Sequence, residues 1–225
     1  MNLTLEIFSF IVGFLAIVVA ITVHEFAHAF LADRLGDPTP RLQGRLTLNP
    51  LAHLDPIGTL LLLIARFGWG KPVQFDPFNL RNPRRDAALI SIAGPISNLL
   101  LATAASIVLR VLLGLQYSVI AHTTETIGII AAILISFLNS LIYMNVVLAI
   151  FNLIPIHPLD GFKIVGGFLN PSQAREWYSL ERYGFIFLIL LIFPMFGNTA
   201  PISYILSPAL KIILSILLPS SGATI

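Results

Sequence analysis

Two histidines and a glutamate interrupt an apolar stretch near the start of the sequence. The segment HEFAH places His24 and His28 four residues apart, with Glu25 directly after the first histidine. On a helix, residues with this spacing lie on the same face, so both imidazoles can reach one ion. In the HExxH pattern the two histidines bind zinc and the glutamate acts as general base. Hydrolytic zinc needs three protein ligands and an open position for water, so one ligand must come from elsewhere.

The alternative explanation is a chance HExxH match that binds no metal. The three side chains would then form a buried polar network, or they would lie at a helix end that reaches the membrane surface. The motif continues an apolar segment, IFSFIVGFLAIVV, that is typical of a membrane-spanning helix. Ionisable side chains in such a helix are costly and usually functional. The position therefore favours a metal site.

The third ligand is expected in the stretch NVVLAIFNLIPIHPLDGFKI, residues 145–164. A predicted span ends near Pro155, because proline cannot continue a helix without losing a hydrogen bond. Asp160 follows in a segment that we expect to be irregular and buried in protein. His157 is a rival ligand, and a Pro-Asp-Gly turn is another explanation for Asp160. The residues alone leave these alternatives open.

The composition indicates a membrane protein. Of the 225 residues, 56% are hydrophobic and only 11% are charged, whereas about a quarter of the residues of a soluble domain are charged. The net charge of +2 and the lack of a basic run give no indication of nucleic-acid binding. The absence of cysteine excludes disulfides and thiolate ligands. The N-terminus has no basic n-region, so we expect the first apolar run to be retained.

The hydropathy pattern predicts an all-α polytopic membrane protein with about five transmembrane helices. The run 57–66 is too short to cross, and we expect it to be a re-entrant or short extended segment after the first helix. The predicted spans are 5–33, 87–114, 127–154, 183–197 with its flanks, and a weaker one at 201–218.

We expect a single membrane-embedded domain over residues 1–225. Its catalytic core would cover about 5–165, and additional C-terminal helices would lie at about 176–218.

The basic residues predict the orientation in the membrane. Eight of the thirteen Lys and Arg residues lie between 34 and 85 and three lie between 163 and 182, whereas the loop 115–126 has none. The positive-inside rule then places residues 34–86 and 155–182 in the cytoplasm and the N-terminus outside. The ends of the first and third spans would share the cytoplasmic face, so the active site is expected near that face.

Three motifs carry a resemblance to a known family. HEFAH at 24–28, AGPISN at 93–98 and FNLIPIHPLDG at 151–161 together resemble the site-2 protease family of intramembrane zinc metalloproteases. GRLTLNPLAHLDPIG at 44–58 is similar to compact bacterial members. The resemblance covers most of residues 15–165, and we expect no PDZ or CBS domain in this chain.

The resemblance implies roles for the residues at the matching positions. One zinc ion would be held by His24, His28 and Asp160. Glu25 would activate water, and Asn152 would bind substrate or stabilise the oxyanion.

The remaining motif residues have open roles. Gly94, Pro95 and Asn98 match the family's Gly-Pro-x-x-Asn element, for which close helix packing is the alternative to a role in the site. The family usually has an apolar residue or proline at the position of His157. That histidine could support a ligand, contact substrate or replace a ligand.

The resemblance also implies substrates and a location. The substrates would be single-pass transmembrane proteins or signal-peptide remnants, cleaved within the lipid bilayer of the cell membrane by a multi-pass enzyme. We expect the substrate to unwind and pair with an edge strand around 40–48 or 57–80.

The alternative is a divalent-metal transporter or channel that uses His24, His28 and Asp160 as a transit site. Glu25 is not needed for transit, and no inverted repeat, which many transporters have, is visible.

Overall fold

Three long helices form the centre of the molecule. The computed structural model describes residues 3–65, 68–118, 125–194 and 199–219. Within these residues, α1 (Leu3–Arg34), α4 (Pro83–Ser118) and α5 (Glu125–Asn152) are long and apolar enough, by length and composition, to cross a membrane. The prediction of an all-α membrane protein is therefore confirmed, while the count of five spans stays a prediction.

Small residues let these three helices approach one another closely. Lipid tails are as apolar as leucine, so helices in a membrane associate through close packing rather than through hydrophobic burial alone. Alanines lie where α1, α4 and α5 meet, and larger apolar side chains fill the spaces between them. The buried core cluster consists of Ala16, Ala102, Ala105, Leu109, Leu138, Leu141, Ile142 and Val146.

Short elements connect α1 to α4. They are α2 (Thr39–Leu42), η1 (Pro50–Ala52), α3 (Pro56–Ala65) and η2 (Pro77–Asn79). The run that we expected to be too short to cross forms α3, and ten residues of helix span only about 15 Å. The edge strand expected around 40–48 or 57–80 is absent from the described residues of these ranges, where pairing is limited to an isolated bridge between Leu54 and Gly70.

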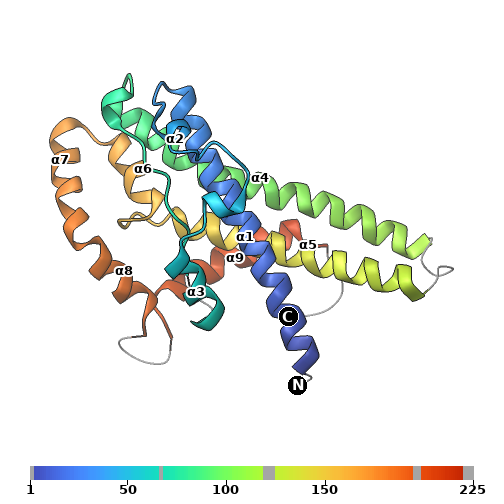
Figure 1. Ribbon diagram of the computed structural model, residues 1–225. Coiled ribbons are helices and arrows are strands. Elements are labelled where there is room, and N and C mark those ends of the chain that lie inside the picture. The colour runs from blue at the N-terminus through green and yellow to red at the C-terminus, as the bar shows by residue number, and fades with distance from the viewer. Residues whose placement is uncertain (1–2, 66–67, 119–124, 195–198, 220–225) are drawn as a thin grey trace.

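The chain continues beyond α5 in shorter helices. These are α6 (Asp160–Phe168), α7 (Pro171–Ser179), η4 (Leu180–Tyr183), α8 (Gly184–Ile192) and α9 (Ile202–Leu217). α6 packs against α4, and α9 packs against α5. Figure 1 shows α7 and α8 set apart from the three long helices, on the side opposite to the end of α4 and the start of α5.

The predicted span at 183–197 differs from the structure in its described part, and residues 195–197 lie outside the described residues. α8 ends at Ile192, and Phe193 has an extended backbone. The reason is Pro194, because a proline disfavours the helical conformation of the residue before it. Nine residues of helix measure about 14 Å, about half of the hydrocarbon thickness of a bilayer.

The C-terminal end of α9 is fixed to α4 by polar side chains. Arg110 donates to the carbonyl oxygen of Ile216 at 2.7 Å, and Ser106 donates to that of Leu217. The last carbonyl groups of a helix lack partners within the helix, and a cation near them is favourable. These contacts hold α9 against the bundle.

Candidate metal centre

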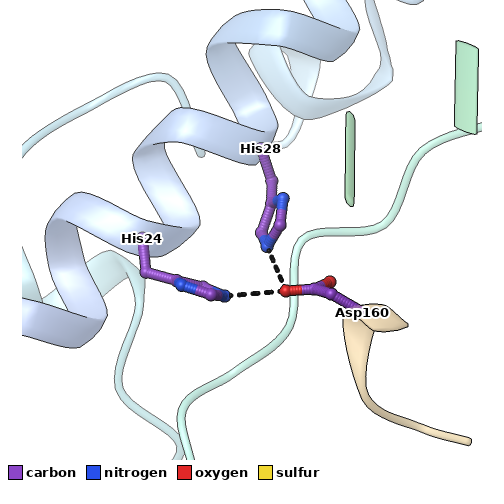
Figure 2. Close-up of side chains that lie close together, drawn as sticks. All are labelled: His24, His28 and Asp160. Atoms are coloured by element: carbon purple, nitrogen blue, oxygen red, sulfur yellow. Dashed lines mark ion pairs between the residues drawn. The ribbon is translucent and has the colours of Figure 1, made fainter. Parts of the chain in front are cut away.

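Three side chains from two helices meet beside α1. His24 and His28 project from one face of α1, and Asp160 projects toward them from the start of α6 (Figure 2). Oδ2 of Asp160 lies 3.1 Å from Nε2 of His24 and 3.3 Å from Nε2 of His28. The three candidate ligand atoms all lie within 4.8 Å of one another, and both histidines are buried. Asp160 thus forms one cluster with two histidines that precede it in the chain by 132 and 136 positions.

Asp160 lies in a helix rather than in the irregular segment that we expected. The irregular backbone ends at Leu159, and Asp160 is the first residue of α6. The helix can begin there because Gly161 has no side chain. A Cβ at this glycine would lie 2.3 Å from the carbonyl oxygen of Leu153, near the end of α5. The close return of the chain onto α5 carries Asp160 to the histidines.

Hydrogen bonds on the far side of each ring determine which atom faces Asp160. Nδ1 of His28 lies 2.7 Å from the carbonyl oxygen of Ile90. A carbonyl oxygen can only accept, so this Nδ1 carries the proton. Nδ1 of His24 lies 2.6 Å from Oδ1 of Asn98, which also accepts. In a neutral ring protonated at Nδ1, Nε2 presents a lone pair. Both histidines therefore direct lone pairs at the carboxylate.

The cluster fits a bound cation. Oδ2 of Asp160 is buried and has no hydrogen-bond partner among the described residues. Three electron-rich atoms that face each other in a buried position are unfavourable unless a positive charge lies between them. Two imidazoles and a carboxylate are a ligand set of catalytic zinc that leaves one coordination position open. As is typical of such sites, each histidine is held by a hydrogen bond from the ring nitrogen that would not bind the metal. The residues thus fit zinc.

The predicted Gly-Pro-x-x-Asn element lies directly against the histidines. A Cβ at Gly94 would lie 2.5 Å from Nε2 of His28 and 2.6 Å from Cε1 of His24, so only glycine leaves room for the two rings. Pro95 is buried inside α4, which continues through it. Asn98 is fully buried and contacts His24.

Glu25 is held by a segment whose contact with it was not predicted from the sequence. One carboxylate oxygen of Glu25 accepts from the backbone N–H of Val73 at 2.8 Å. The guanidinium of Arg45 donates to the carbonyl oxygens of Ala52 and Lys71 and so fixes the chain two residues before Val73. Burial lowers the pKa of Arg45, and the negative charge of Glu25 opposes this effect. No periodic pattern links residues 25, 45 and 73, so the sequence alone gave no signal for this contact.

Two other predicted site residues have different partners. Nδ2 of Asn152 donates to the carbonyl oxygen of Leu148 at 3.0 Å, within α5. Nδ1 of His157 lies 3.5 Å from Oε1 of Glu181, and its ring packs edge-on against Phe162. The structure thus pairs His157 with η4, and the roles expected for Asn152 and His157 stay predictions.

A membrane protein with a buried His-His-Asp cluster beside a glutamate has the features of a metallopeptidase. The chain belongs to peptidase family M50, whose family model matches residues 12–191. The resemblance to site-2 proteases is therefore confirmed.

Three curated relatives carry metalloprotease names. "Putative zinc metalloprotease YwhC" of Bacillus subtilis (strain 168) is 40% identical over 200 residues, which cover 88% of this chain and 84% of the relative. "Putative zinc metalloprotease Rip2" of Mycolicibacterium smegmatis is 33% identical over 181 residues, and that of Mycobacterium tuberculosis (strain H37Rv) is 31% identical over 179. Each Rip2 match covers 77% of this chain and 63% of the relative. No solved structure matches the chain significantly. The family and these names support a metalloprotease and agree with zinc as the metal.

Proposed function

We propose that this chain is an intramembrane zinc metalloprotease that hydrolyses peptide bonds in transmembrane segments of other proteins. The observation that carries the proposal is the convergence of three electron-pair donors, Nε2 of His24, Nε2 of His28 and Oδ2 of Asp160, on one buried point. α1, which supplies two of them, is long and apolar enough to cross a membrane. A metal ligand set on such a helix supports hydrolysis within the bilayer.

The position of the cluster along α1 supports an active site near one membrane face. His28 precedes the helix end at Arg34 by six residues, or about 9 Å of helix. The loop that follows carries most of the basic residues, which favours the cytoplasmic side for this end and the outside for the N-terminus. The protein would cross the membrane several times, and water would reach the site from the cytoplasm.

The surrounding residues support peptide hydrolysis. Zinc, when bound, would act as a Lewis acid that polarises a carbonyl group and lowers the pKa of a bound water to about 7. Glu25 would take a proton from the attacking water and deliver it to the leaving amine. The N–H of Val73 fixes the orientation of this carboxylate. The amide of Asn152 has two N–H groups, of which one is bonded to Leu148, so the other would donate to the oxyanion.

The substrate class follows from the location of the site. A transmembrane helix must unwind before its peptide bonds can be attacked, because they are hydrogen-bonded within the helix. Residues 71–76 are non-helical and include Val73, which touches Glu25. This segment is where an unwound single-pass protein or signal-peptide remnant would pair.

The test compares Glu25→Gln with the wild type in lipid vesicles that contain a tagged single-pass substrate. We expect cleavage to fall by about 10²–10⁴-fold, the usual contribution of a general base, while zinc content is retained. Glu6→Gln is the matched control, because Glu6 lies in the first turn of the same helix. Cleavage that survives in Glu25→Gln would contradict the mechanism. A wild type that cleaves nothing but moves zinc across the vesicle membrane would support transport instead.

A further inference from the structure

The two histidines are held by different kinds of partner. His28 donates to a backbone carbonyl group, that of Ile90, whereas His24 donates to a side chain, that of Asn98. A side-chain amide can present either its oxygen or its nitrogen, so something must keep the oxygen of Asn98 toward His24. Asn145 on α5 contributes to this constraint, together with the carbonyl oxygen of Ala20.

A chain of hydrogen bonds runs from α5 to the metal centre in one direction. Nδ2 of Asn145 donates to the carbonyl oxygen of Leu141 at 2.8 Å, which turns Oδ1 of Asn145 toward α4. Nδ2 of Asn98 donates to this Oδ1 at 2.8 Å and to the carbonyl oxygen of Ala20 at 3.1 Å. Oδ1 of Asn98 then faces Nδ1 of His24 at 2.6 Å. In each of these hydrogen bonds the acceptor is an oxygen atom that cannot donate, so the direction of the whole chain is determined.

We infer that Asn145 is a positioning residue of the metal centre and acts through Asn98 on the tautomer of His24. Both asparagines are fully buried, so water cannot replace a lost partner easily. If the amide of Asn98 turned over, its oxygen would face the oxygens of Ala20 and Asn145, and its nitrogen would face the N–H of His24. The relay excludes that arrangement and keeps the proton of His24 on Nδ1.

The inference rests on the proposed function, because the tautomer matters only if Nε2 of His24 binds the metal. A proton on Nε2 would block this ligand. α5 then has two roles in the site, since the same helix orients His24 and leads the chain to Asp160. Partners of metal-bound histidines typically contribute 10–100-fold to metal affinity, so an effect of about this size is expected.

The first experiment measures zinc affinity of the full chain by competition with a chelator. Asn98→Leu removes the acceptor of His24 and should weaken zinc binding by about 10–100-fold. Asn145→Leu removes the next residue of the relay, and we expect a loss of about tenfold. Asn139→Leu is the matched control. Asn139 also lies on α5, donates to the carbonyl oxygen four residues earlier at 3.0 Å and is exposed, and its substitution should leave zinc affinity unchanged.

Two further variants separate a relay from a loss of packing. In the double variant Asn98→Leu/Asn145→Leu, the loss should equal that of Asn98→Leu alone, because Asn145 acts through Asn98. Asn145→Asp should restore near-normal affinity. A buried carboxyl group favours its neutral form, which can donate to Leu141 and accept from Asn98.

A spectroscopic measurement reports the tautomer directly. In zinc-loaded protein with ¹⁵N-labelled histidine, the His24 signal is identified by its loss in His24→Asn. We expect a slowly exchanging proton on Nδ1 in the wild type and in Asn145→Asp, and faster exchange in Asn98→Leu and Asn145→Leu.

The outcomes distinguish the relay from the proposed function. Wild-type zinc affinity and proton exchange in Asn145→Leu would overturn the relay alone, as would additive losses in the double variant or an equal loss in Asn139→Leu. A wild type that binds no zinc would overturn both the relay and the proposed function.

Discussion

Replacing Gly94 with alanine is a sharp test of the metal centre because it changes no ligand. The added Cβ would lie 2.5 Å from Nε2 of His28 and 2.6 Å from Cε1 of His24. Non-bonded heavy atoms prefer a separation of about 3.5 Å or more, so the rings must move by about 1 Å. Zinc sites tolerate shifts of only about 0.2 Å around a Zn–N distance of about 2.0 Å. The rings cannot move freely, because Ile90 and Asn98 hold their Nδ1 atoms.

We therefore expect Gly94→Ala to weaken zinc binding by at least about 100-fold, or about 2.7 kcal/mol. The fold should survive, since alanine is favoured over glycine in a helix by about 1 kcal/mol. Zinc affinity is measured by chelator competition, and the melting temperature of the zinc-free protein reports folding.

Gly128→Ala is the control for this substitution. Gly128 lies in α5, and a Cβ there would meet no described atom within 4 Å. Its zinc affinity should match that of the wild type. If Gly94→Ala bound zinc as tightly as Gly128→Ala, the packing of α4 against the two imidazoles would not be as described, and the reasoning would fail.

Three further substitutions test other parts of the structure. Asp160→Asn preserves shape but removes the negative ligand, so zinc affinity should fall by at least about tenfold, the lower end of the effect of a supporting partner; unchanged affinity would exclude this residue as a ligand. Arg110→Leu leaves the carbonyl oxygen of Ile216 without its donor, so protease should cut near the end of α9 sooner, and an unchanged digestion pattern would contradict the anchoring role. Asp37→Asn should lower the melting temperature at pH 7, because partly buried donors lose a charged acceptor, and a hydrogen bond to a charged group contributes about 1.5–3 kcal/mol; a difference from the wild type that stays constant with pH would contradict a depressed pKa of this carboxyl.

The pH dependence of Asp37 follows from its surroundings. Burial alone would raise the pKa of this carboxyl, but hydrogen bonds from Thr39, Asn79 and the N–H of Asp76 outweigh it and hold the pKa below its usual range. A depressed folded-state pKa gives stability that is present above the unfolded pKa of about 3.9 and is lost as pH falls through the folded value. The difference in melting temperature between the wild type and Asp37→Asn should therefore narrow below about pH 4.

Local periodicity was enough to predict the residues that share a helix. His24 and His28 were predicted on one helical face from their spacing, and the long apolar runs predicted α1, α4 and α5 within a few residues. The composition was enough to predict a membrane protein. These features depend on helix geometry and on the hydrophobicity of the residues. Both can be read from a single sequence.

Contacts between distant segments could not be predicted in the same way. Nothing in the sequence links Asn145 to Asn98, or Val73 to Glu25, because these contacts depend on how α1, α4 and α5 pack. Gly94 illustrates the same limit. Its motif suggested close helix packing, but only the structure shows that the neighbours are the two imidazoles.

The division of the His-His-Asp cluster between α1 and α6 has a consequence for biosynthesis. Two of the three residues emerge from the ribosome early, while Asp160 follows only after α4 and α5 have been made. Nascent chains therefore pass through a stage in which both imidazoles have been synthesised and the carboxylate does not yet exist. The complete cluster of three residues therefore cannot form before α4 and α5 have been synthesised.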